Sequence, residues 1–332
     1  MRERGYRANY SPDIHQNEIS WCYQIRLNRI NVVNTFVQQI INFLQLGSIY
    51  ALCALSFTMV YGVARLVNFA HGSIFGVSMY VLFFASTYLF NVIESTWLVY
   101  VISLVISCIV TSLIALLLER VAYTPLRNAP KVAVVVSSVG AGMVIEYLIL
   151  NIAGSKALRM PSLIPNIKFD LLGVSVPLYK FMIIIIAIIT MVVLNIVIKK
   201  TKLGIAMRAV SQDRVAAGFM GIQTSKVVSA SFVFGAIIAA VAASLYGTAY
   251  SIFAYDVGES IIWWSFIAAV LGGIGSINGA VLGGYIIGAI SVLAPIILPV
   301  SSYKDIVAFA VLIIVLLVKP TGLLGKKGIE KI

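Results

Sequence analysis

Long apolar runs separated by short polar breaks fill the chain from residue 33 onward. Seven runs cover about 33–61, 69–90, 97–118, 131–153, 179–198, 227–251 and 303–318, and the 259–298 stretch is long enough for two more segments. A helix needs about 20 apolar residues to cross a hydrocarbon core about 30 Å thick, and inside lipid every backbone amide must be paired within the segment. The pattern therefore predicts an all-α, polytopic transmembrane helix bundle with eight or nine membrane segments.

Composition agrees with this pattern and limits what else the chain contains. Of 332 residues, 61% are hydrophobic and 11% are charged, and the mean hydropathy is +1.01. These spans leave too little sequence for a folded catalytic domain outside the membrane. The predicted organisation is a polar N-terminal extension over 1–32, a transmembrane domain over 33–318 that contains a loop at 199–226, and a basic tail over 319–332.

Basic residues are twice as numerous as acidic ones, with 24 Lys and Arg against 12 Asp and Glu. In a chain this apolar, the excess indicates membrane topology rather than nucleic-acid binding, and the lipid bilayer is the expected surrounding. Six basic residues lie in the 199–226 loop and four in the tail, so both are predicted to be cytoplasmic. The 252–260 loop carries Asp256 and Glu259 without a basic residue and is predicted to face outward.

The region between that outward loop and the cytoplasmic tail must cross the membrane an odd number of times. Residues 259–318 therefore form either three passes or one pass with a re-entrant or broken piece near 259–298. The interruption Gly272–Ser276 favours a break in the helix at that point. The sequence leaves the choice between the two arrangements open.

Motifs for catalysis are missing from the sequence. It holds no G-x-x-x-x-G-K-[ST] phosphate-binding loop and no H-E-x-x-H zinc motif, and its histidines are His15 and His71. The cysteines Cys22, Cys53 and Cys108 are too scattered for a metal site or a disulfide framework. We expect no enzyme activity, no cofactor and no bound metal.

Glycines and one acid stand out inside the apolar runs. Gly279 and Gly283, and likewise Gly284 and Gly288, are four residues apart, a spacing that lets two helix backbones approach closely in lipid. Glu146 lies well inside its run, where a carboxylate must face a partner, a cavity or water. A possible translocation path is assigned to Asn68, His71, Glu146, Gly272, Gly273 and Gly275.

The 201–222 segment is too polar and too short to span the membrane. Leu203, Met207 and Val210 recur at helical spacing, and so do Val215 and Phe219. This spacing predicts two short amphipathic helices at the inner surface. Such helices either contact a cytoplasmic partner or rest on lipid headgroups.

The sequence RAVSQD at 208–213, followed by Ala216-Ala217 and Gly221-Ile222, resembles the ATPase-coupling loop of ABC-importer permeases in its branched-chain amino-acid variant. Four other segments resemble that family in the same order: 46–52, 59–72, 271–284 and 319–325. The resemblance covers about residues 34–327 and is to the first of two paralogous membrane subunits of the leucine, isoleucine and valine importer. A glutamate that the wider importer pattern has before Ala216 is replaced here by Val215.

The resemblance implies a transport subunit in a bacterial inner membrane. Its implied partners are a second paralogous permease subunit, two cytoplasmic ATPase subunits and an extracytoplasmic substrate-binding protein. The implied coupling-loop residues are Gly204, Arg208, Asp213, Ala216, Ala217 and Gly221. The expected function is ATP-driven import of branched-chain amino acids. Alternatives are urea or short amides as substrate, or an autonomous ion-coupled secondary transporter.

Overall fold

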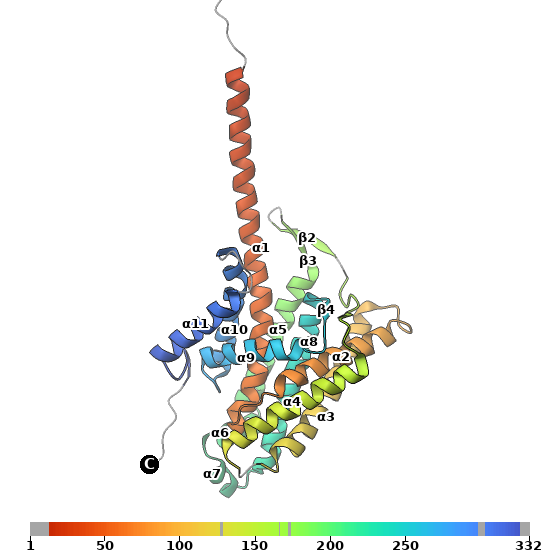
Figure 1. Cartoon of the computed structure of the whole chain (residues 1–332), viewed down its shortest axis with the longest axis vertical. Coiled ribbons are helices and arrows are strands. Elements are labelled where there is room, and N and C mark those ends of the chain that lie inside the picture. Colours follow the sequence, from red (N-terminus) through yellow and green to blue (C-terminus); the bar gives the residue numbers. More distant parts are fainter. Residues whose placement is uncertain (1–12, 127–128, 166, 172–173, 298–302, 326–332) are drawn as a thin grey trace, which may run out of the picture.

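The computed structural model describes residues 13–126, 129–165, 167–171, 174–297 and 303–325. The described part is almost entirely helical (Figure 1). Its helices are α1 (Asp13–Ala64), α2 (His71–Leu89), α3 (Thr96–Leu118), the π-helical turn η1 (Glu119–Tyr123), α4 (Lys131–Ala153), α5 (Leu178–Lys200), α6 (Lys202–Gln212), α7 (Arg214–Phe219), α8 (Thr224–Ala249), α9 (Val257–Gly272), α10 (Ile277–Ile297) and α11 (Tyr303–Val318).

Seven of these helices are long and apolar enough to cross a membrane, which confirms the predicted all-α polytopic bundle. The spans lie in α1 from Asn34, in α2, in α3 with η1, in α4, in α5, in α8 and in α10. Helices α9 and α11 have 16 residues each. With these two, the described helices correspond to the nine apolar segments that the pattern marked.

The predicted polar extension and basic tail lie partly outside the described residues, at 1–12 and 326–332. From Asp13 the backbone is already helical and continues without interruption into the first span. Figure 1 shows this part of α1 projecting beyond the bundle. The functional boundary at residue 32 stays a prediction.

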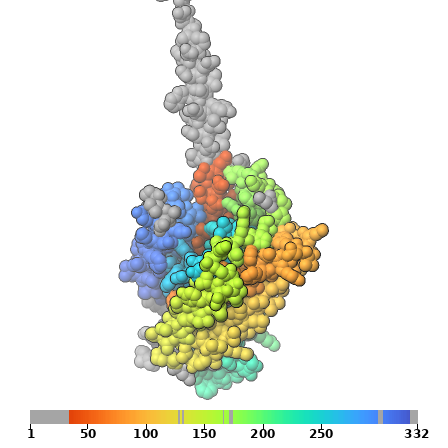
Figure 2. Space-filling model, turned by 45° about the vertical axis from the view of Figure 1, so that its right-hand side comes forward, coloured from red at the N-terminus to blue at the C-terminus, as the bar shows by residue number. Residues whose placement is uncertain are grey.

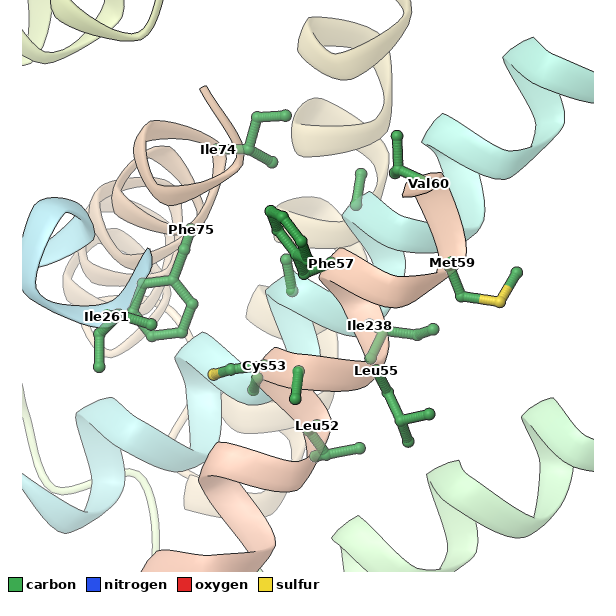
Figure 3. Packing of buried hydrophobic residues seen from close by; sticks show 14 of the residues in the cluster. Leu52, Cys53, Leu55, Phe57, Met59, Val60, Ile74, Phe75, Ile238 and Ile261 are labelled. Atoms are coloured by element: carbon green, nitrogen blue, oxygen red, sulfur yellow. The ribbon is translucent and has the colours of Figure 1, made fainter. Parts of the chain in front are cut away.

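Helix α1 is the centre of the bundle, and α10, α8, α9 and α5 pack along it. Between Ile49 and Val63, α1 has almost no exposed apolar side chain. Figure 3 shows side chains of α1, among them Leu52 and Phe57, packed between Ile74 and Phe75 of α2, Ile238 of α8 and Ile261 of α9. Helices α3, α4 and α5 expose most of their surface and form the periphery.

Two small β-structures occupy the end of the bundle where the first span begins. Strand β1 (Leu158–Arg159) pairs antiparallel with β4 (Ile252–Phe253), and β2 (Lys168–Leu171) forms a hairpin with β3 (Val174–Pro177). Val174 and Val176 of the hairpin pack against Ile41 of α1. The 153–178 connection therefore lies beside the 252–260 loop, which the sequence predicts to face outward.

The opposite end of the bundle collects the loops that the sequence analysis placed in the cytoplasm. Figure 1 shows α6 and α7 beside the end of α1. There Arg65, just after α1, donates a hydrogen bond of 2.5 Å from Nη2 to the carbonyl oxygen of Ser211 in α6. The connection between α1 and α2 and the 199–226 loop, which is predicted to be cytoplasmic, are thus neighbours in the fold.

The glycine-rich interruption separates α9 from α10, as the sequence indicated. Gly273 and Gly275 have φ angles of +109° and +88°, which favour glycine, and they form the turn between the two helices. Helix α10 runs alongside α1, whereas α9 crosses it in Figure 1 and is about 24 Å long, shorter than a full span. The region thus holds one span-length helix, α10, between two shorter helices.

Candidate functional site

The predicted coupling loop, residues 201–222 and named the coupling loop below, is fixed to the end of α5 by three contacts around α6. The Thr201 side chain caps α6 by accepting a hydrogen bond from the backbone N–H of Gly204, at 3.1 Å. Arg208 donates from Nη1 to the carbonyl oxygen of Ile198, at 2.5 Å. A Cβ at Gly204 would collide with the carbonyl oxygens of Val197 and Ile198, so glycine is needed for this close approach.

Asp213 joins the two short helices of the loop. Its Oδ1 accepts hydrogen bonds from the backbone N–H groups of Val215 at 2.9 Å and Ala216 at 3.0 Å, which caps the start of α7. Gly221 ends this region with a φ of +80°, and an added Cβ there would meet no atom within 4 Å. Within this chain, glycine at 221 therefore serves the turn rather than a close approach.

The amphipathic pattern predicted for the loop is confirmed for two of the three apolar positions in α6 and differs for α7. Met207 and Val210 of α6 are buried, as the spacing indicated, whereas Leu203 is 37% exposed. In α7, Ala217 is buried, while Val215 is 68% exposed and Phe219 is 87% exposed. A helix of six residues has room for one inward position, and here the small alanine takes it. Figure 2 shows the loop at the lower end of the molecule.

The connector between α1 and α2, residues 65–70, leads into a buried polar junction. Asn68 is 2% exposed and its Oδ1 accepts a hydrogen bond of 2.6 Å from the hydroxyl of Tyr123. His71 begins α2, is 4% exposed and shares a 2.8 Å hydrogen bond between Nε2 and the Ser56 hydroxyl of α1. The structure thus brings together two of the six path candidates, Asn68 and His71.

The sequence analysis missed Glu119, which lies at the end of α3 and is 4% exposed. Its carboxylate accepts hydrogen bonds of 3.0 Å from the hydroxyls of Thr124 and, on α8, Ser229. A cavity of about 20 Å³, enough for roughly one water molecule, is lined by Glu119, Tyr123 and Arg214 among others. The signal available in the sequence was an acid directly following an apolar run.

Glu146 lies apart from that junction, on α4, and is half-buried. One turn further along α4, Ile149 meets α2 and α9, because a Cβ at Gly76 of α2 would lie 3.8 Å from Ile149 and 3.9 Å from the backbone of Gly258. The exposed carboxylates of Asp256 and Glu259 at the start of α9 are near enough to repel the negative charge of Glu146. Three acidic residues, Glu146, Asp256 and Glu259, therefore lie near one another on α4 and at the start of α9.

The other path candidates, Gly272, Gly273 and Gly275, lie at the turn between α9 and α10. A Cβ at Gly272 would collide with the backbone of Gly279, and one at Gly273 with the backbone of Gly325. The backbone N–H groups of Leu323 and Leu324 donate to the carbonyl oxygens of Leu271 and Gly272. Gly272 and Gly273 therefore allow other backbone segments of the same chain to pack closely against this turn.

The stripe glycines of α10 pack in two directions. A Cβ at Gly279 or Gly283 would collide with backbone of α9, at Gly272 and Ala268 respectively. A Cβ at Gly284 or Gly288 would collide with backbone of α1, at Ala51 and Gly47 respectively. All four positions support helix packing, the role that their spacing suggested.

The fold and these sites define an integral membrane protein of the polytopic helical class, with a structured loop at one end. Within the described residues, no group of three or more His, Cys, Asp or Glu is placed to hold a metal ion. Residues 39–316 match the family model described as branched-chain amino acid transport system / permease component. The chain belongs to this family.

Curated relatives cover nearly the whole chain. It is 37% identical over 302 residues to the high-affinity branched-chain amino acid transport system permease protein LivH of Escherichia coli (strain K12) and, at the same identity, to that of Salmonella typhimurium. It is equally similar to the corresponding protein BraD of Pseudomonas aeruginosa. Each match covers 90% of this chain and 98% of the relative. The chain is thus a membrane permease, and the resemblance stated from its motifs is confirmed.

Proposed function

We propose that the chain is a permease subunit of an ATP-driven importer of branched-chain amino acids in a bacterial inner membrane. The observation that carries the proposal is the match to bacterial relatives whose names state this transport activity, over nearly the full length of both chains. Coverage of this extent leaves little of the relatives' length without a counterpart. The nine apolar helical segments supply the multi-pass architecture that a permease needs.

Cytoplasmic ATPase subunits are the proposed occupants of the coupling-loop surface. The sequence holds no phosphate-binding loop of its own. Val215, Phe219 and Met220 form an exposed apolar surface on α7 and the turn after it. Helix α6 is bonded to α5 through Arg208, so a push on this surface would move a transmembrane helix. ATP-driven closure of the ATPase pair would in this way bias the permease between outward-open and inward-open states.

A second permease subunit is the proposed cover of the α4 and α9 face. The most exposed side chains of α3 and α5 in the bundle are apolar, including Leu98, Val105, Ile109, Ile188 and Val192. Helix α4 also exposes apolar side chains such as Val144 and Ile152, but α4 and the start of α9 add the exposed polar residues Tyr147, Asn151, Asp256, Glu259 and Ser260. Lipid tails cannot solvate a carboxylate such as that of Glu146, which lies inside an apolar run near Asp256 and Glu259, so the first face suits lipid and the second suits protein or a water-filled path. Asn68, His71 and Glu146 remain our candidates for that path.

Cysteine cross-linking tests this assignment of faces. Val144 on α4 and Ile189 on α5 are 60% and 55% exposed, which makes them a matched pair. With a cysteine at one or the other position in the full complex, we expect cross-links to the second permease from position 144 and none from 189. The reverse result would exchange the two faces.

An extracytoplasmic binding protein is the proposed partner at the opposite end, where the β2–β3 hairpin and β1–β4 lie. The decisive experiment reconstitutes the chain with a second permease, two ATPases and the binding protein in proteoliposomes. We expect labelled leucine to enter only with ATP and the binding protein present. Ion-driven uptake by the chain alone would indicate a secondary transporter instead. Preference for urea over leucine would contradict the proposed substrate.

A further inference from the structure

The connector at residues 65–70 is held by several elements at once, although it is six residues long. Arg65 donates to the Ser211 carbonyl in the coupling loop. The backbone N–H of Phe69 donates to the Ser138 hydroxyl of α4, at 3.3 Å. Asn68 accepts from Tyr123 of η1, at 2.6 Å. The connector is therefore the place where the coupling loop, α4 and the α3–η1 segment meet.

Tyr123 lies between this connector and the elements that follow the coupling loop. Its ring packs edge-on against Phe232 of α8, with 5.1 Å between centroids. One turn earlier, Glu119 accepts a hydrogen bond from Ser229 of α8. Arg214, the first residue of α7, lines the same small cavity as Glu119 and Tyr123. A displacement of α8 thus reaches Tyr123 through the contact with Phe232, and a displacement of α7 changes the cavity that Arg214 and Tyr123 both line.

Asn68 carries an unusual feature for so deeply buried an amide. Its Nδ2 group has no hydrogen-bond partner among the described residues, although the side chain is 2% exposed. A buried donor without a partner destabilises the conformation that holds it. In a protein that alternates between two states, such a group favours a second state in which it is paired.

We propose that the Tyr123–Asn68 hydrogen bond is a joint that carries displacement of the coupling loop to the start of α2, and that the Asn68 amide exchanges partners between the two transport states. This rests on the proposed function, because it concerns how ATPase motion enters the permease. The next link is short: the backbone N–H of His71 donates to the carbonyl oxygen of Asn68 at 3.3 Å. His71 in turn bonds Ser56 of α1. Tyr123 and Asn68 are positioning residues and need not touch the substrate.

Tyr123→Phe is the sharpest test because it removes one hydroxyl and keeps the ring packing. In the reconstituted complex, we expect the loss of thermal stability to match that of the control below and ATP hydrolysis to stay near its unmodified value, while uptake per ATP falls about fivefold, the factor that corresponds to one hydrogen bond. Tyr100→Phe is the matched control. Tyr100 is equally buried and shares a 3.2 Å hydrogen bond with Ser244, far from the connector in sequence and contacts.

A second variant separates a joint from a general packing effect. If Tyr123 and Asn68 act through one bond, Tyr123→Phe with Asn68→Ala should lower uptake per ATP no further than Asn68→Ala alone. Hydrogen exchange of the backbone amides at 71–76 gives a readout that needs no substrate. Addition of a non-hydrolysable ATP analogue should change this exchange in the unmodified complex and leave it unchanged in Tyr123→Phe.

Each outcome decides between the two proposals. An unmodified complex that fails to import leucine yet shows the nucleotide-dependent exchange would overturn the proposed substrate and leave the joint supported. Unchanged exchange behaviour and uptake per ATP in Tyr123→Phe would overturn the joint while the importer function stands. An equal loss of uptake per ATP in Tyr100→Phe would overturn it as well, because the effect would then follow from any lost buried tyrosine hydroxyl.

Discussion

Glycines serve different purposes in α10 and in the coupling loop. In α10, Gly283 and Gly284 have no room for a Cβ, because backbone of α9 and α1 occupies the position. In the loop, Gly204 likewise packs against backbone of α5, but Gly218 and Gly221 have open space around them. The first pair provides proximity between helices, whereas Gly221 provides a backbone conformation, φ +80°.

The difference follows from the surroundings of the two regions. Lipid tails are as apolar as leucine, so helices inside the membrane associate through close packing, and small residues make that packing possible. Outside the hydrocarbon, short helices are held by caps and hydrogen bonds, as Thr201 and Asp213 show. Substitutions in α10 should therefore affect assembly of the protein, and those in the loop should affect the coupling of ATP hydrolysis to uptake.

Gly283→Ala should have the largest effect. Its new methyl group would occupy the position of the Ala268 carbonyl group, so the backbones of α9 and α10 must separate. We expect a loss of about 1–3 kcal/mol or more, seen as low yield of complex in detergent. Gly140→Ala in α4 is the matched control, since a Cβ there meets nothing within 4 Å. Normal yield of the Gly283 variant would contradict the close contact.

Gly221→Leu should rank second, and it should leave the folded permease intact. A leucine at φ +80° costs roughly 1–2 kcal/mol locally and would reorient the exposed α7 surface. We expect ATP hydrolysis without matching uptake in proteoliposomes. Gly221→Asn should retain more coupling, because asparagine tolerates this conformation better. Equal uptake per ATP in both variants and the unmodified protein would make the loop a passive surface element.

Asp213→Ala should have a smaller effect of the same kind. It removes a cap typically worth about 0.5–2 kcal/mol, which would loosen α7 relative to α6. The measurement is again the ratio of uptake to ATP hydrolysis. Asp213→Asn is the control, since asparagine caps about as well as aspartate. If the Asn variant lost as much coupling as the Ala variant, the charge rather than the cap would be responsible.

Arg208→Ala should give the smallest change in this series. It removes the guanidinium donor to the Ile198 carbonyl, but Arg208 is exposed and Gly204 still packs against the same turn of α5. Exposed polar contacts of this kind contribute about 0–1 kcal/mol. We expect a decrease in uptake per ATP of less than about threefold. A complete loss would show that Arg208 contacts a partner subunit directly.

Features of α10 and of the spans could be predicted from the sequence, whereas contacts between distant residues could not. Apolar run length gave the spans, glycine spacing gave the α10 contacts, and the interruption at 272–276 gave the turn, because each depends on residues close together in the chain. The Tyr123–Asn68 bond joins residues 55 positions apart, and no local pattern indicates it. In the sequence, Glu119 is a polar residue at the end of an apolar run. In the structure it is buried and accepts a hydrogen bond from Ser229, 110 residues away.

Helix α7 shows a different limit. Its residues follow helical spacing, and spacing alone would turn Val215 and Phe219 inward. The structure turns the small Ala217 inward instead and leaves the larger side chains outside. Periodicity identifies an apolar face but says nothing of whether this chain or another protein covers it.

The position of α1 has a consequence for how the protein is made. The first span leaves the ribosome early, yet one of its main packing partners is α10, and the Ser48 and Tyr285 hydroxyls that meet across this contact at 3.0 Å are 237 residues apart. During synthesis, α1 is inserted before α10 has been made, so it stays incompletely packed until most of the chain has been synthesised. The carbonyl oxygens of Leu271 and Gly272 at the end of α9 gain their hydrogen-bond donors later still, when Leu323 and Leu324 have been synthesised. A chain released before residue 323 therefore lacks the donors for these carbonyl oxygens. We expect membrane proteases to degrade it.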